Sequence, residues 1–329
     1  MNVTVLGSGS WGTTVAALTT ARNPTVLWAR RPEVAEEVSA GHSNERYLPG
    51  FTLPRRLRGT ADLQEACAGA DVVILGVPSA GFRDVLSEAA AWVRPWVPVV
   101  SLTKGFEGGT LLRMTEVIEE VLPGHPAAAL SGPNLAREIM GGQAAASVIA
   151  TRDLGVAAAL QQVLRHKLFR VYMNHDVVGC EAGGALKNVI AIAAGIAQGL
   201  GVGDNTRAAV ITRGLAELTR LGVAMGAEAQ TLAGLAGMGD LIATCMSPLS
   251  RNRSVGEQLG RGRRLGDILA ELHMVAEGVG TAALVLELAE RWGVELPICR
   301  EINRIVRGEA VPTDAYRGLM APGHEADPG

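Results

Sequence analysis

The segment Val3–Gly12, with the sequence VTVLGSGSWG, decides the fold of the N-terminal part of this chain. Its first four residues form an apolar, β-branched run that predicts a buried strand, and Thr13–Arg22 has the pattern of a helix. The intervening glycines follow the spacing G-x-G-x-x-G in the strand–turn–helix context of a dinucleotide-binding loop. In such a loop Gly7 allows the tight turn, Gly9 lets a pyrophosphate approach the backbone, and Gly12 lets the helix pack against the sheet. Since a helix N-terminus also attracts phosphate, the segment favours dinucleotide binding over a glycine-rich turn without a ligand.

Short apolar runs alternate with helical patterns through the first half of the chain. Such alternation is typical of right-handed βαβ crossovers and predicts a doubly wound parallel sheet. The expected strands are Val3–Leu6, Thr25–Trp28, Val72–Leu75, Val97–Leu102 and Ala127–Leu130, with Ala145–Ala150 and Phe169–Tyr172 as further candidates. The expected helices are Thr13–Arg22, Glu33–Ala40, Ala61–Ala68, Phe82–Ala91 and Leu111–Val121.

The strand pattern ends near residue 175, and long helical stretches follow. A chain of 329 residues is also longer than one hydrophobic core usually serves. We therefore predict an α/β protein with a Rossmann-like NAD(P)-binding domain over residues 1–175. An all-α substrate-binding and catalytic domain is expected over residues 176–329.

Composition and charge exclude several classes of function. The formal net charge of −3 does not favour a nucleic-acid partner. The four cysteines form no C-x-x-C pair and the histidines show no metal-ligand spacing, so we expect reduced thiols and no metal site. The apolar stretch at residues 189–202 is too short to cross a bilayer and predicts a buried helix. With no signal-peptide pattern at the start, we expect a cytoplasmic protein without a membrane span.

Arg30 and Arg31 follow the second expected strand, where an NAD-selective site usually has an acidic residue that binds the ribose 2′-hydroxyl. A guanidinium instead suits a 2′-phosphate, because its planar fork makes paired, charge-assisted hydrogen bonds. We therefore predict that NADP(H) or NAD(H) binds and that NADP(H) is preferred. The alternative is a solvated basic turn.

The second half carries two unusual groups of polar residues. The pair Lys187-Asn188 interrupts an apolar, small-residue helix, and a buried lysine is costly unless it has a partner. The alternative is a lysine whose ammonium extends to the surface. Further along, Gly239-Asp240 and Ser250-Arg251-Asn252 offer a carboxylate, a hydroxyl, a guanidinium and an amide. These group types suit a small phosphorylated polyol.

These motifs, in this order, resemble those of the NAD(P)-dependent glycerol-3-phosphate dehydrogenases, particularly the bacterial branch. The resemblance covers nearly the whole chain. It is carried by Gly7–Gly12, Asn44-x-x-Tyr47-Leu48-Pro49, Thr103-Lys104-Gly105, Ser131-Gly132-Pro133, Gly184–Asn188, Asn205-Thr206, Gly239-Asp240-Leu241, Ser250–Asn252 and Val275-x-Glu277-Gly278.

The resemblance implies interconversion of dihydroxyacetone phosphate and sn-glycerol 3-phosphate, which supplies phospholipid synthesis. Lys187 would be the general acid and base, Lys104 would support the developing oxyanion, and Asp240 would orient Lys187 or a substrate hydroxyl. The substrate-binding set implied by the resemblance is Lys104, Lys187, Asn188, Asp240, Thr244, Ser250, Arg251 and Asn252.

The resemblance also implies which residues bind the cofactor. The set is Gly7, Gly9, Ser10, Trp11, Gly12, Arg30, Arg31, Lys104, Gly132, Ala136, Arg251, Val275 and Glu277. One position departs from the pattern, because the family commonly has Ser after Ser131-Gly132-Pro133 and this chain has Asn134. Asn134 keeps a hydrogen-bonding side chain, so we expect cofactor binding to survive.

Two other functions stay open from sequence. One is another two-domain dehydrogenase with a catalytic lysine, acting on a β-hydroxy acid or on ketopantoate, which the Ser250–Asn252 segment disfavours. The other is a non-catalytic NADPH sensor, which would have no reason to keep Lys104, Lys187, Asp240 and Arg251 together. A homodimer is a further expectation from the resemblance.

Overall fold

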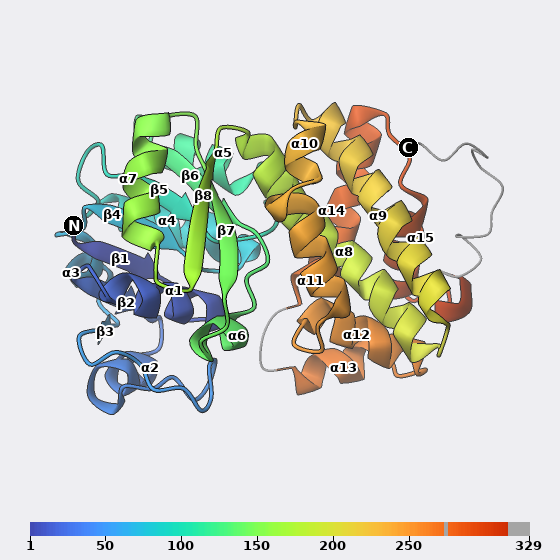
Figure 1. The fold of residues 1–329 in the computed structure, drawn as a ribbon, viewed down its shortest axis with the longest axis horizontal. Coiled ribbons are helices and arrows are strands. Elements are labelled where there is room, and N and C mark those ends of the chain that lie inside the picture. Colours follow the sequence, from blue (N-terminus) through green and yellow to red (C-terminus); the bar gives the residue numbers. More distant parts are fainter. Residues whose placement is uncertain (273–275, 315–329) are drawn as a thin grey trace. The chain divides into compact units, whose positions relative to one another are not determined.

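A computed structural model of the chain describes residues 1–272 and 276–314. Figure 1 shows a β-sheet with flanking helices in the N-terminal part and helices alone in the described C-terminal part. The chain divides into two compact units, Met1–Glu181 and Ala182–Gly329, and this division falls inside one long helix. The domain boundary at 175/176 stays a prediction.

The first unit contains one eight-stranded sheet with the strand order β3-β2-β1-β4-β5-β6-β7-β8. Neighbouring strands run parallel, except that β6 and β7 are antiparallel. The predicted doubly wound sheet is thus confirmed as a mostly parallel one. The strands are β1 (Val3–Leu6), β2 (Thr25–Trp28), β3 (Arg58–Thr60), β4 (Val72–Leu75), β5 (Val99–Ser101), β6 (Ala127–Ser131), β7 (Ala145–Ala150) and β8 (Phe169–Asn174).

Helices cover both faces of this sheet. One core packs α1, α6 and α7 against the sheet, and the other packs α3, α4 and α5 against the opposite face. The helices of this unit are α1 (Ser10–Thr20), α2 (Pro32–Glu36), η1 (Glu37–Gly41), α3 (Leu63–Cys67), η2 (Ser79–Gly81), α4 (Phe82–Ala90), α5 (Met114–Val121), α6 (Ala136–Met140) and α7 (Leu154–Leu164).

The central strands β1, β4 and β5 each contribute side chains to both cores. Along β4, Val72 and Ile74 belong to the core with α1, whereas Val73 and Leu75 belong to the core with α4. Successive side chains of a strand point to opposite faces, so a strand that is buried on both faces needs an unbroken apolar run. The strand ranges of β1, β2, β4 and β7 agree with the expected ones.

The described residues of the second unit form helices only. Its central helix is α8 (Val177–Gly199), which has the length and apolar composition of a membrane span, although 94% of its most apolar window is buried inside the protein. Burial of that kind is usual for the core helix of a globular domain. The remaining helices are α9 (Asp204–Ala224), α10 (Ala229–Leu232), η3 (Leu235–Gly239), α11 (Asp240–Met246), α12 (Arg251–Gly260), α13 (Leu265–Glu271), α14 (Glu277–Trp292) and α15 (Pro297–Val306).

Helices α8 and α12 pack with their backbones in direct contact. A Cβ atom on Gly256 would overlap the carbonyl oxygen of Ile192, and one on Gly195 would overlap the carbonyl oxygen of Arg253. Glycines at these positions therefore let the two helices approach more closely than side chains would allow. The approach places the first residues of α12 beside the middle of α8, where Lys187 and Asn188 lie.

Candidate active site

The glycine loop between β1 and α1 has the geometry that a dinucleotide needs. Gly7 has φ +115°, and a Cβ there would lie 2.7 Å from the carbonyl oxygen of Gly76. A Cβ on Gly12 would overlap the carbonyl oxygen of Gly7. Gly9 differs, because its φ of −63° suits any residue and a Cβ would meet nothing closer than 4.0 Å. The fold itself therefore requires Gly7 and Gly12, and the open space over Gly9 fits an approaching pyrophosphate.

The start of α1 adds polar groups to this loop. Ser10 is the first helical residue, so the unpaired N–H groups of the first turn lie directly after Gly9. The Nε1 atom of Trp11 is buried and has no hydrogen-bond partner among the described residues. A buried donor of this kind fits a ligand that brings an acceptor.

Asn44 contacts this loop from elsewhere in the sequence, which assigned no role to it. Its fully buried amide nitrogen donates to the backbone oxygen of Ser8 and to Oγ1 of Thr13, both at 2.9 Å. Asn44 thereby holds the loop against the first turn of α1. The Asn44–Pro49 motif was visible in the sequence, but its contact with a loop so far away along the chain was not.

The two arginines after β2 differ in their surroundings. Both are exposed, and Nη1 of Arg31 lies 3.5 Å from a carboxylate oxygen of Glu33. Arg30 makes no ion pair with any residue in the described part of the chain. A 2′-phosphate would therefore compete with Glu33 at Arg31 and with solvent alone at Arg30.

Lys104 follows β5 and reaches the turn after β6. Its Nζ atom donates to the backbone oxygen of Gly132 at 2.8 Å. Two expected site residues, Lys104 and Gly132, are thus in contact, and Ala136 begins α6 a few residues further on. These residues and the glycine loop all belong to the first unit.

The second unit brings Lys187, Asp240 and Thr244 together in a buried cluster. Nζ of Lys187 donates to Oδ1 of Asp240 and, at 2.6 Å, to Oγ1 of Thr244. The side chains of Lys187 and Asp240 are only 7% and 2% exposed, which contradicts the alternative of a lysine that extends to the surface. Thr244 Oγ1 also donates to the backbone oxygen of Asp240 at 2.6 Å, so its lone pairs face Lys187. The cluster presents an ammonium held by a carboxylate.

Asn188 and Asn252 link α8, α12 and α14. Nδ2 of Asn252 donates to Oδ1 of Asn188 at 2.9 Å, and Oδ1 of Asn252 accepts from the backbone N–H of Gly278 at 3.0 Å. Ser250 caps α12, where its Oγ accepts from the backbone N–H of Arg253. The two asparagines and Ser250 are buried. Their hydrogen bonds hold the start of α12 against α8 and α14.

Arg251 lies at the start of α12, next to these groups. Burial lowers the pKa of its guanidinium, and the charge of Glu277 opposes that effect. A cation that is costly to bury gains most from an anionic ligand. Glu277 begins α14, and Val275 lies outside the described residues.

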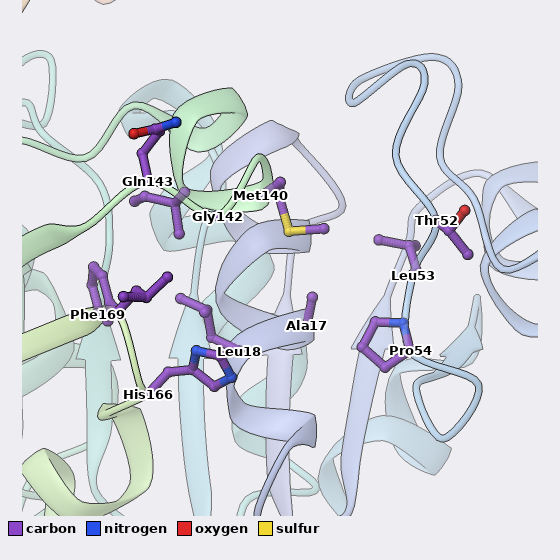
Figure 2. Close-up of a pocket in the computed structure, with 12 residues that line it drawn as sticks. Ala17, Leu18, Thr52, Leu53, Pro54, Met140, Gly142, Gln143, His166 and Phe169 are labelled. Carbon is purple, nitrogen blue, oxygen red and sulfur yellow. The ribbon is translucent and has the colours of Figure 1, made fainter.

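The expected site residues therefore fall into one group in each unit. A pocket of about 370 Å³ lies elsewhere in the first unit, and none of the expected site residues line it. Figure 2 shows its walls, which include Leu18, Leu53, Met140 and His166. Within residues 1–272 and 276–314, no cluster of His, Cys, Asp and Glu has the arrangement of a metal site.

Two family models match this chain. Residues 2–157 match the family model of the NAD-dependent glycerol-3-phosphate dehydrogenase N-terminus, and residues 176–317 match that of the C-terminus. A protein of Sphingopyxis alaskensis named glycerol-3-phosphate dehydrogenase (NAD(P)+) 2 is 57% identical, over 100% of this chain and 99% of its own length. A glycerol-3-phosphate dehydrogenase (NAD(P)+) of Mycobacterium avium is 53% identical, over 98% and 96%.

The structural comparison points the same way. The crystal structure of glycerol-3-phosphate dehydrogenase from Coxiella burnetii matches with a TM-score of 0.93 and 35% identity, covering 98% of this chain and 99% of that one. Identity at this level, together with both family models, shows more than a shared fold. The chain belongs to the NAD-dependent glycerol-3-phosphate dehydrogenase family.

Proposed function

We propose that this protein interconverts dihydroxyacetone phosphate and sn-glycerol 3-phosphate by hydride transfer with a nicotinamide dinucleotide. The observation that carries the proposal is the buried Lys187–Asp240–Thr244 cluster. Burial of an ammonium is expensive, and this one is matched by a carboxylate and a hydroxyl acceptor. Its proton is therefore held at a defined point, as a general acid requires.

The nicotinamide supplies the hydride when it is bound. As the ketone carbon is reduced, negative charge develops on the ketone oxygen, and Lys187 donates a proton from Nζ to that oxygen. Asp240 keeps the ammonium in place, and Thr244 accepts a second of its N–H groups. In the reverse direction neutral Lys187 removes the hydroxyl proton. The proposed role of Lys104 is to stabilise the same developing oxyanion.

The phosphate of the substrate is proposed to bind at the start of α12. Arg251 supplies a guanidinium that burial disfavours, so a phosphate would offset the cost of its desolvation. Asn252, which Asn188 and Gly278 hold in place, supplies a neighbouring amide. This arrangement favours a phosphorylated substrate over a β-hydroxy acid or ketopantoate.

Arg30 and Arg31 support a preference for NADPH, which would favour synthesis of glycerol 3-phosphate for phospholipids in the cytoplasm. A homodimer belongs to the same proposal, since the second unit exposes large apolar side chains such as Met246 and Trp292. Light scattering of the purified protein tests the dimer.

The experiment that tests the proposed reaction follows the absorbance of the reduced nicotinamide with dihydroxyacetone phosphate, once with NADPH and once with NADH. We expect both to be oxidised, NADPH faster at equal concentrations. If neither is consumed, the substrate assignment is wrong, and keto acids become the next substrates to try. Tight NADPH binding without turnover on any of them would favour the sensor.

A further inference from the structure

Two buried polar atoms, one at the end of β6 and one in the turn after it, lack hydrogen bonds within the described part of the chain. Oγ of Ser131 and Nδ2 of Asn134 have no hydrogen-bond partner among the described residues. A buried donor left unpaired costs about 1–3 kcal/mol, so native proteins keep few of them. Such atoms are expected where a polar ligand completes the hydrogen bonds.

A hydrogen bond from Ser147 determines which side of the Asn134 amide is engaged within the fold. Its fully buried hydroxyl lies on β7 and donates to Oδ1 of Asn134 at 2.7 Å. With the amide oxygen engaged, the amide nitrogen on the other side of the group keeps both N–H donors. The side chain of Asn134 is therefore oriented as a donor.

The same serine also packs against the turn itself. Gly132 has φ +133°, and a Cβ there would lie 3.1 Å from Cα of Ser147. The carbonyl oxygen of Gly132 accepts the hydrogen bond from Nζ of Lys104 at 2.8 Å. Asn134 belongs to this turn and the ammonium of Lys104 contacts it, and both groups favour an oxygen ligand with negative or partial negative charge.

We propose that Ser147 is a positioning residue, which holds the amide oxygen of Asn134 so that the amide nitrogen donates to an oxygen of the ligand bound beside Lys104. This inference rests on the proposed function, in which that oxygen belongs either to the nicotinamide carboxamide or to the three-carbon substrate. Both sources offer the same chemistry, an oxygen that accepts from an N–H. The Asn134–Ser147 pair replaces the serine that the family commonly has at the first of these positions.

The test compares the wild-type enzyme with Ser147→Ala, Asn134→Ala and the double variant. We expect Ser147→Ala to lower kcat/KM by about 3- to 10-fold, the usual worth of one hydrogen bond. If Ser147 acts through Asn134, it adds no further loss in the Asn134→Ala background. The matched control is Thr151→Val, because the buried hydroxyl of Thr151 follows β7 and donates only to the backbone oxygen of Ala127, at 2.8 Å. Thr151→Val should lose about as much thermal stability as Ser147→Ala, while its kcat/KM stays unchanged.

Two binding measurements identify the ligand. A weaker Kd for NADPH alone assigns the oxygen to the carboxamide, whereas a raised KM for dihydroxyacetone phosphate at saturating NADPH assigns it to the substrate. Additive losses in the double variant, or an equal loss of kcat/KM in Thr151→Val, would overturn the role of Ser147. If the wild-type enzyme shows no turnover, the proposed reaction is refuted instead. In that case, unchanged NADPH affinity in all variants would also refute the proposed role of Asn134 and Ser147.

Discussion

At the scale of single residues, the proposed chemistry depends most on Lys187. Replacing it with Ala or with Met, which keeps the aliphatic stem, should lower kcat by about 10²- to 10⁴-fold, the usual contribution of general acid–base catalysis. NADPH affinity should change little, since no cofactor role is assigned to Lys187. The third lysine of the chain, Lys167, is exposed, so Lys167→Ala is the control. Stopped-flow and steady-state kinetics measure the turnover of these variants and of the control. Near-normal turnover in both Lys187 variants would refute the acid–base assignment.

The preference for NADPH over NADH should depend on Arg30 and Arg31. Both Arg30→Ala and Arg31→Ala should lower the ratio of kcat/KM for NADPH to that for NADH. The larger fall is expected for Arg30, because Arg31 is already near Glu33, at 3.5 Å, and would gain less from a 2′-phosphate. Each charge-assisted hydrogen bond is worth about 1.5–3 kcal/mol, which corresponds to about 10- to 150-fold. If this ratio is the same in the wild type and in both variants, the arginines do not determine cofactor preference and form only a solvated basic turn.

At the scale of elements, the contact between α8 and α12 holds the substrate side of the site together. Gly256→Ala should displace α12, since its Cβ would overlap the backbone of Ile192, and overpacking of a core typically costs about 1–3 kcal/mol. We expect a lower unfolding temperature and a raised KM for dihydroxyacetone phosphate. Gly266→Ala in α13 is the matched control, because its Cβ would meet nothing within 4 Å. It should be neutral or stabilising by up to about 1 kcal/mol. Equal behaviour of the two variants in thermal unfolding and kinetics would contradict this account.

The elements themselves were predictable where the pattern was strong. Strands buried on both faces were recognised from apolar runs, whereas β3 is a polar edge strand, Arg58–Thr60, that has no such run. Helix α7 was missed although Asp153 caps it, accepting hydrogen bonds from the N–H groups of Gly155 and Val156. The antiparallel direction of β7 was not visible either, since alternating strands and helices do not state strand direction. That direction is what places Ser147 beside the turn after β6.

At the scale of the whole molecule, the site was predictable as a set of residues but not as a set of contacts. Lys187 on α8 lies in contact with Asp240 and Thr244 on α11, as the motifs indicated. The hydrogen bond from Asn252 to Asn188 required knowledge of how α12 crosses α8. Asn44 and Ser147 carry no local signal of their roles, since an isolated polar residue has many possible partners.

A last prediction concerns the pH dependence of global stability. Glu217 on α9 is 5% exposed, and its carboxylate accepts from the first N–H groups of α15, those of Ile298 at 2.6 Å and Cys299 at 3.1 Å. Burial raises the pKa of the Glu217 carboxyl above its usual range, and the two backbone hydrogen bonds oppose this only in part. The folded state therefore binds the proton more tightly than the unfolded state. Its contribution to stability is complete below the pKa of the unfolded chain and is lost as pH rises through the raised pKa.

Urea unfolding of the wild type and of Glu217→Gln at about pH 5 and pH 8 measures this contribution, because the amide cannot ionise. The free energy of unfolding of the wild type, relative to that of the variant, should fall between the lower and the higher pH. The exposed Glu290→Gln supplies the control and should show no such change with pH. If the difference between wild type and Glu217→Gln instead grew toward pH 8, the carboxylate form would be the stabilising one, and the hydrogen bonds from α15 would outweigh the cost of burying its charge.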